Sequence, residues 1–143
     1  MIKIPLEYTF DSIDIGTKEK FKILISEKII SDFAEISGDF NPLHMLDDFA
    51  VKTKFKKRVC HGMLLASFLS RLVGMYLPGK NALYFSQTLN FILPCFIDDT
   101  ITIEGKIIDK SPATKIISIK TTITNQKNEL VLDGIAKVMI INN

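Results

Sequence analysis

The chain has 143 residues, of which 47% are hydrophobic and 24% are charged, and its formal net charge is +2. A chain of this length forms one globular domain with a substantial core, and it leaves no room for a second. The small net charge, with Lys and Arg spread along the whole chain, excludes the extended basic surface that nucleic-acid binding requires.

The sequence also bears on the compartment of the protein. Residues 1–10 lack the long apolar stretch of a signal peptide. The most apolar segment, residues 63–77, is shorter than the ~20 residues of a membrane span and is interrupted by Arg71. Cys60 and Cys95 have no metal-ligand spacing and fit a reducing cytosol as free thiols. We therefore expect a soluble cytoplasmic protein without a membrane partner.

The first half of the chain is predicted to contain a strand and two helices. Alternating apolar residues predict a strand over residues 21–25. Ser26 then caps an amphipathic helix that ends at Gly38. A turn-rich loop over residues 39–44, a short helix around residues 47–52 and a basic loop follow.

The second half is predicted to contain one buried helix and several strands. Residues 63–76 are apolar around most of a helical circumference, and Pro78-Gly79 ends this helix, so a sheet should bury it. Four strands are predicted after it, over residues 82–92, 100–109, 115–125 and 130–141. One buried helix and an antiparallel sheet predict a single α+β domain over residues 1–143.

Two segments carry residues suited to acid-base chemistry. Asp39 and His44 lie five residues apart, and Gly38, Asn41 and Pro42 bend the chain around them. A carboxylate and an imidazole so placed can face one water molecule and move its proton. Gly62 opens the buried helix, where unpaired N–H groups and the positive end of the helix dipole favour a developing oxyanion.

The segment from Phe33 to Ser70 resembles the (R)-specific enoyl-CoA hydratases, in the MaoC-like dehydratase branch of the hot-dog fold. The residues that carry this resemblance are Phe33-Ala34, Ser37 to His44, Phe49-Ala50, Phe55, His61 to Ser67 and Ser70. A weaker likeness continues through Leu77 to Lys80 and Gln87 to Phe91 to the end of the chain. The resemblance implies an antiparallel sheet wrapped around one long helix.

The resemblance also implies a reaction, which is the reversible hydration of trans-2-enoyl-CoA thioesters to (R)-3-hydroxyacyl-CoA. Asp39 would be the base that activates water, His44 would share the proton work, and the Gly62 N–H would donate to the thioester oxygen. Coenzyme A enters as part of the substrate, and neither a metal nor a redox cofactor is expected. Two such sheets joined at an open edge would make a homodimer.

Further residues are candidates for substrate binding. By resemblance, Ser70 lies near the catalytic pair, and a hydrophobic acyl pocket would be lined by Phe68, Leu69 and Val73. A basic run just before His61 would attract the phosphates of coenzyme A; the members of the run that we assign to this role are Lys56, Lys57 and Arg58.

Each of these residues also has a structural interpretation. Aspartate commonly forms turns in such loops, so Asp39 could serve the turn alone. His61 is interpreted as a helix-start residue whose ring bonds to backbone. Ser70 could bond to the carbonyl four residues back, and the basic run could be a solvated loop. Three alternative functions remain: a hot-dog acyl-CoA thioesterase, a non-catalytic acyl-binding subunit, and a dehydratase for a specialised thioester.

Overall fold

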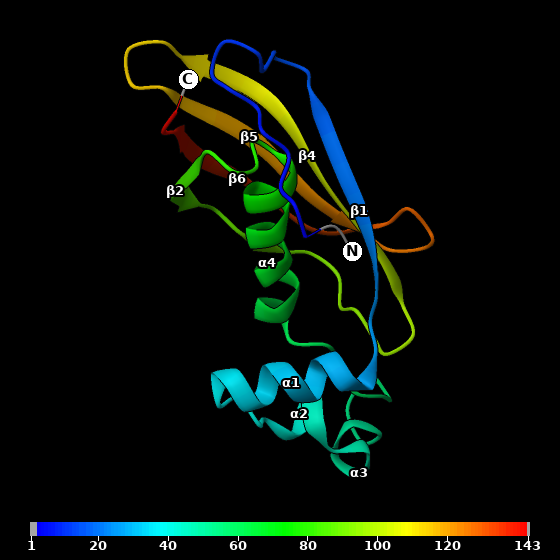
Figure 1. Ribbon diagram of the computed structural model, residues 1–143. Helices are drawn as coiled ribbons and strands as arrows, with labels where there is room; N and C mark the ends of the chain where they lie inside the picture. Colours follow the sequence, from blue (N-terminus) through cyan, green and yellow to red (C-terminus); the bar gives the residue numbers. More distant parts are fainter. Residues whose placement is uncertain (1–2, 143) are drawn as a thin grey trace.

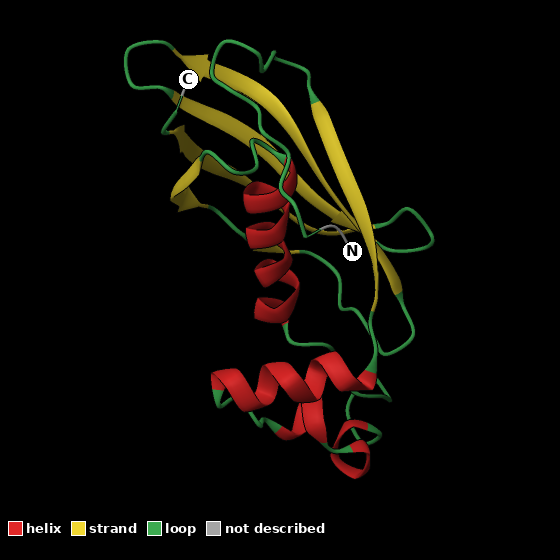
Figure 2. Cartoon of the chain, in the orientation of Figure 1, coloured by secondary structure: helices red, strands yellow, loops and turns green. Residues whose placement is uncertain are grey.

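The computed structural model describes residues 3–142, and within them one six-stranded antiparallel sheet curves around a helix (Figures 1 and 2). The elements in chain order are β1 Lys18–Leu24, α1 Glu27–Ser37, α2 Pro42–Met45, α3 Asp47–Ala50, α4 Gly62–Arg71, the π-helical η1 Leu72–Tyr76, β2 Ala82–Gln87, β3 Asn90–Phe91, β4 Thr100–Ser111, β5 Ile116–Thr124 and β6 Leu130–Ile140. The α+β hot-dog architecture predicted from the sequence is confirmed.

The sheet is ordered β1-β4-β5-β6-β2, and β3 also pairs with β6. All the pairings between these strands are antiparallel. The three long central strands alternate buried and more exposed residues, so one face of the sheet packs against α4 and η1. β1 and β2 form the two edges.

The core is built by α4 and η1 against this face. Leu64, Leu65 and Leu69 of α4 are buried in one cluster with Ile101 and Ile103 of β4. A second cluster of buried residues packs η1 against β5 and β6. Gly105 allows the helix to approach β4 closely, because a Cβ there would lie 3.0 Å from Leu72 Cδ2.

The helix caps follow the sequence prediction, whereas several element boundaries differ from it; for example, β1 begins at Lys18 and the helix predicted over residues 63–76 divides into α4 and the π-helical η1. Ser26 Oγ accepts from the Ile29 N–H, and Gly38 ends α1 in the left-handed region at φ 78°. The loop predicted after Gly38 contains the helical turn α2, because Asn41 caps it and Pro42 suits a first helical position. The strand predicted over residues 82–92 is interrupted after β2.

The interruption has a steric counterpart at Gly134 of β6. A Cβ on Gly134 would lie 1.8 Å from the Thr88 carbonyl oxygen, so the chain between β2 and β3 crosses closely over this glycine. Beyond the interruption, β3 resumes pairing with β6 at Asn90 and Phe91. This route brings Phe91 towards the start of α4.

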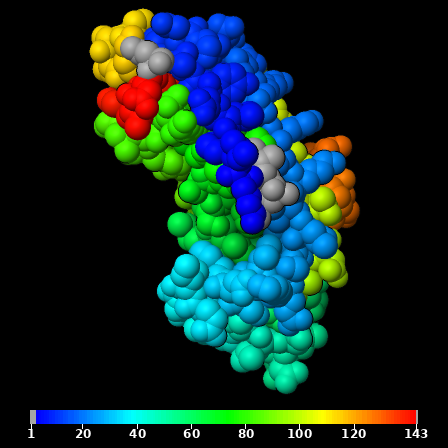
Figure 3. Space-filling model, in the orientation of Figure 1, coloured from blue at the N-terminus to red at the C-terminus, as the bar shows by residue number. Residues whose placement is uncertain are grey.

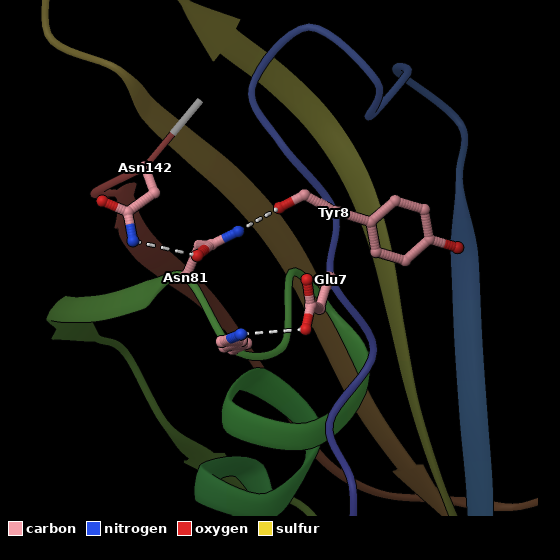
Figure 4. Close-up of polar contacts among 5 residues, drawn as sticks. Glu7, Tyr8, Asn81 and Asn142 are labelled. Carbon is pink, nitrogen blue, oxygen red and sulfur yellow. Dashed lines mark hydrogen bonds and ion pairs between the residues drawn. The ribbon is translucent and has the colours of Figure 1, made fainter.

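Polar contacts hold the N-terminal segment against the sheet (Figure 4). Asn81 Nδ2 donates to the Tyr8 carbonyl at 3.2 Å, and Asn142 Nδ2 donates to Asn81 Oδ1 at 3.3 Å. The Lys80 ammonium pairs with Glu7 at 3.0 Å. The segment before β1 is thereby joined to the start of β2 and the end of β6.

The segment from α1 to α3 projects from one end of the sheet layer, as Figure 3 shows in cyan and blue-green. In Figure 1 the N-terminal end of α4 faces α1 and α2. Asp39, His44 and Gly62 all belong to this junction. None of the helices in residues 3–142 is long and apolar enough to cross a membrane.

Candidate active site

Side-chain turns bring Asp39 and His44 together. Asp39 Oδ1 accepts from the Asn41 N–H at 3.1 Å, and Asn41 Oδ1 accepts from the Leu43 N–H at 3.0 Å. These two bonds turn the chain so that His44, on α2, folds back towards Asp39. One carboxylate oxygen of Asp39 and one ring nitrogen each of His44 and His61 all lie within 4.8 Å of one another.

A backbone contact sets the orientation of the His44 ring. His44 Nδ1 lies 2.7 Å from the Val59 carbonyl oxygen. Because a carbonyl only accepts, Nδ1 carries the hydrogen, and in the neutral ring Nε2 is left as an acceptor. A water molecule between this Nε2 and the Asp39 carboxylate would therefore meet two acceptors.

Arg58 links α2, which carries His44, to α1. Its Nε donates to the His44 carbonyl at 2.7 Å, and its guanidinium pairs with Glu27 at 2.8 Å. Only 6% of Arg58 is exposed. The structure therefore does not bring Arg58 to a rim where it could meet coenzyme A phosphates; it joins α2 to the start of α1.

His61 lies buried between α4 and the loop that carries Asp39. It is the N-cap residue of α4, and its Nε2 donates to the Asp39 carbonyl at 3.0 Å. Its ring stacks on that of His44, with centroids 4.1 Å apart and 29° between the planes. The His61 ring therefore bonds to backbone, as the sequence analysis expects of a helix-start residue.

The same stacking bears on metal binding at Asp39, His44 and His61. Two imidazoles that bind one ion each direct a ring nitrogen at it, whereas two nearly parallel stacked rings do not. The His44 and His61 rings would have to turn before they could share an ion.

Gly62 opens α4, and within residues 3–142 its N–H makes no hydrogen bond. A Cβ at this position would lie 2.9 Å from Phe91 Cδ1 and Cε1, so the glycine leaves room for the Phe91 ring. Gly62 and His44 both line a pocket of about 360 Å³. Its other lining residues are Phe55, Val59, Cys60, Leu65 and the segment 91–95.

An apolar pocket of about 370 Å³ lies on a neighbouring face of α4. It is lined by Phe33, Met63, Ala66, Ser67, Leu69, Ser70, Tyr84, Gln87 and Leu89. Two of the residues assigned to substrate binding, Leu69 and Ser70, are among them. The Ser70 hydroxyl forms no hydrogen bond within the part of the chain that the structure describes.

Phe68 and Val73 lie elsewhere. The side of α4 that carries Phe68 packs into the first core cluster, and Val73, 1% exposed, belongs to the cluster beneath η1. Helical periodicity explains why Phe68 does not line the apolar pocket. Met63, Ala66 and Ser70 lie on one face of α4, and Phe68 points away from that face. The structure does not bring these two residues to either pocket.

Of the remaining assigned basic residues, Lys57 lines a pocket that adjoins the site. Its Nζ is 4.3 Å from the centroid of the Phe96 ring. Lys57 lines a polar pocket of about 320 Å³, which shares Leu93 and Pro94 with the His44 pocket. Lys56 is exposed and has a φ of 64°.

Comparisons with known proteins place the chain in a family. Residues 11–129 match the family model described as MaoC like domain. The chain belongs to the MaoC-like domain family. It is 39% identical to an (R)-specific enoyl-CoA hydratase of Rhodospirillum rubrum, over 92% of this chain and 90% of the relative. It is 37% identical to a 3-hydroxybutyryl-CoA dehydratase of Methylorubrum extorquens, over 92% of this chain and 83% of the relative.

A solved structure agrees with this membership. The MaoC-like chain superposes on the (R)-hydratase from A. caviae involved in PHA biosynthesis with a TM-score of 0.88 and 37% identity. The match covers 90% of this chain and 98% of that one. The predicted resemblance to (R)-specific enoyl-CoA hydratases is thereby confirmed.

Sequence reasoning missed several residues around the site of this MaoC-like protein. Phe91 and Cys95 come from the segment after β2, and Phe33 comes from α1. A loop between β5 and β6 adds Gln126 and Lys127 to the polar pocket. These residues meet only through pairing of distant segments, for which the local sequence gives no signal.

Proposed function

We propose that this MaoC-like protein catalyses the reversible hydration of trans-2-enoyl-CoA thioesters to (R)-3-hydroxyacyl-CoA. The observation that carries the proposal is the meeting of three groups at one junction. Asp39 and His44 lie within reach of one water, and His44 shares a pocket with Gly62 at the start of α4. The hydratases and the dehydratase to which the chain is similar support this reaction.

In the proposed reaction, water is held between the Asp39 carboxylate and His44 Nε2. Asp39 takes one proton while the oxygen adds to C3 of the enoyl thioester. The Gly62 N–H stabilises the negative charge that develops on the thioester oxygen. The proton held by the catalytic pair is then delivered to C2. The reaction neither oxidises nor reduces the substrate, so it needs no redox cofactor, and in the proposal Asp39 and the Gly62 N–H take the roles that a metal could otherwise fill.

The two neighbouring pockets provide places for the two ends of the substrate. The acyl chain occupies the apolar pocket lined by Leu69 and Ser70, and the thioester lies between His44 and Gly62. The phosphates of coenzyme A lie near Lys57, in the polar pocket that adjoins the thioester pocket. Lys56 adds positive charge to the same loop, whereas Arg58 is occupied by Glu27 and the His44 carbonyl.

The functional unit is proposed to be a homodimer joined at β2. β2 pairs with β6 on one side only, and β2 and residues 91–93 expose large apolar side chains. They are Leu83, Tyr84, Phe85, Phe91, Ile92 and Leu93. The opposite edge, β1, carries three exposed lysines, which discourage strand pairing: Lys18, Lys20 and Lys22.

The dimer would also complete the site, because Tyr84 and Gln87 of β2 line the apolar pocket. A partner at this edge would close that pocket against water. The proposed compartment is the cytoplasm, where Cys60 and Cys95, both buried and unpaired, would remain reduced.

A substrate screen tests the reaction. The protein is given crotonyl-, hexenoyl- and octenoyl-CoA, and the loss of enoyl absorbance, the release of free thiol and the stereochemistry of the product are measured. Loss of absorbance with an (R)-3-hydroxyacyl product is expected. Release of free thiol would identify a thioesterase instead, because hydration leaves the thioester intact. Binding of the esters without either change would identify a non-catalytic acyl-binding subunit.

A further inference from the structure

His61 contacts both members of the catalytic pair, although the reaction proposed above assigns it no step. It is 1% exposed, its Nε2–H donates to the Asp39 carbonyl at 3.0 Å, and its ring stacks on His44. Asp39 itself is exposed and lies on a loop beyond α1. The contact therefore joins an exposed loop to a buried position at the start of α4.

The protonation of the His61 ring follows from this contact. Since the Asp39 carbonyl only accepts, Nε2 carries the hydrogen, and in the neutral ring Nδ1 is left as an acceptor. This Nδ1 is buried and has no partner in the described part of the chain. Burying an unpaired polar atom costs free energy, which a phenylalanine ring of similar shape would avoid. Packing alone does not explain an imidazole here, whereas the bond to Asp39 does.

Neighbouring rings hold the donor in place. Phe33 packs edge-on against His61, with ring centroids 4.9 Å apart, and His44 covers one face of it. His61 is also the residue directly before Gly62. The position of Asp39 relative to the Gly62 N–H is thus set through a single residue.

We propose that His61 is a positioning residue of this site, which holds the backbone of Asp39 so that its carboxylate faces the same water as His44. This inference rests on the proposed hydratase function. The contact made is to the Asp39 backbone, so His61 acts on the reaction through Asp39 and takes no proton from the substrate.

Two substitutions separate the hydrogen bond from the packing of the ring. His61→Phe keeps a ring between Phe33 and His44 but removes the donor, whereas His61→Gln removes the ring and keeps an N–H near the place of Nε2. We expect His61→Phe to lower kcat for crotonyl-CoA about 10²-fold, the loss typical of misplacing a reacting group by about 1 Å. We expect His61→Gln to retain kcat within tenfold of the wild type. Binding of saturated butyryl-CoA should be unchanged in both.

A double-mutant cycle with Asp39→Asn distinguishes a positioning role of His61 from a merely structural one. If His61 acts through Asp39, adding His61→Phe to Asp39→Asn should lower kcat little further. Ile107→Val, a buried substitution on β4 in the cluster beneath η1, controls for loss of stability without a change in kcat. If His61→Phe does not fold, His61→Ala repeats the cycle.

The proposal is overturned if a folded His61→Phe protein turns over crotonyl-CoA at the wild-type rate, or if the Phe and Gln variants lose the same activity. Fully additive losses in the cycle would also overturn it. An inactive wild-type protein would instead reject the hydratase function on which the inference rests, so the two failures are distinguishable.

Discussion

The catalytic candidates are held in place by backbone groups. His44 donates to the Val59 carbonyl, Asp39 accepts from the Asn41 N–H, and His61 donates to the Asp39 carbonyl. Asp39 Oδ2 and His44 Nε2 take no part in these contacts and are left to act on water. Substitutions that keep these backbone contacts should remove activity while the structure survives.

Asp39→Asn and His44→Asn meet this condition. The first keeps an oxygen for the Asn41 N–H, and the second keeps an N–H near the place of Nδ1 for the Val59 carbonyl. We expect each to lower kcat for crotonyl-CoA by ~10²–10⁴-fold, because each removes an acid-base group. Circular dichroism and the melting temperature would establish that the variants are folded. A folded variant with near wild-type turnover would reject the assignment of that residue.

The two thiols give a prediction on pH. Burial raises the pKa of both Cys60 and Cys95 to about 12, and for Cys60 the charges of Cys95 and Asp99 add to it. In the unfolded chain they ionise near their ordinary value of 9.0, so above that pH the folded state binds more protons. The free energy of unfolding should therefore decrease as the pH rises from 9 towards 12.

Urea unfolding at pH 8 and pH 10 measures this decrease. A Cys60→Ala, Cys95→Ala double variant should show a smaller loss between the two pH values than the wild type. A disulfide reagent that reacts with thiolates should label the native protein slowly at pH 8 and the unfolded protein fast. Rapid labelling of the native protein would contradict the burial of the thiols.

At the scale of elements, the start of α4 has a backbone conformation that accepts proline at Gly62. Gly62 is its first residue, and the preceding residue, His61, has φ −55° and ψ 128°, which proline tolerates in the residue before it. Proline is also favoured at a first helical position. The backbone donor can therefore be removed without unfolding the helix.

We expect Gly62→Pro to lower kcat by ~10²–10³-fold, the usual cost of losing one oxyanion donor. Gly62→Ala is the matched control, because it adds a Cβ near Phe91 and keeps the N–H. It should lose much less activity, since the Cβ would contact only side-chain atoms of Phe91 and no backbone. Binding of butyryl-CoA separates crowding by the proline ring from loss of the donor. Full turnover by a folded Gly62→Pro protein would place the stabilisation of the enolate elsewhere.

The basic loop before α4 gives a second prediction for an element. Lys57→Ser should raise KM for crotonyl-CoA with little change in kcat, because Lys57 lines the pocket that adjoins the proposed thioester site. The increase should shrink with added salt, which screens exposed charges over about 10 Å at 0.1 M. Lys22→Ser, on the exposed part of β1, is the control. Equal KM values for the Lys57 and Lys22 variants would show that the basic loop is an ordinary solvated loop that does not bind coenzyme A.

The elements differ in how far the sequence could predict them. Ser26 and Gly38 bound α1 as expected, because capping depends on residues close in sequence. The local bends around Asp39 and His44 also indicated that the two would meet. The burial of Arg58 was not predictable from a run of lysines, because its partner Glu27 lies 31 residues away. Phe91 reaches Gly62 only through the pairing of β3 with β6, which no local pattern encodes.

At the scale of the whole molecule, the two sheet edges are unlike each other. β1 carries lysines along its length, whereas β2 and the segment after β3 expose aromatic and aliphatic side chains. An apolar unpaired edge is a template for strand pairing. A two-fold axis at this edge would set the same patch of each copy against the other. The apolar pocket, lined by Tyr84 and Gln87, would then be closed by the partner.

We expect the protein to sediment at twice its 16.1 kDa chain mass at micromolar concentration. A Leu83→Lys, Phe85→Lys double variant should sediment as a monomer, because a two-fold interface sets its added charges against one another at a cost of several kcal/mol. Leu24→Lys, on the opposite edge, should remain dimeric. The monomeric variant should also have a raised KM for octenoyl-CoA, since its acyl pocket stays open to water. A wild-type protein found only as a monomer would remove the dimer, and a double variant that still dimerises would place the interface at another surface.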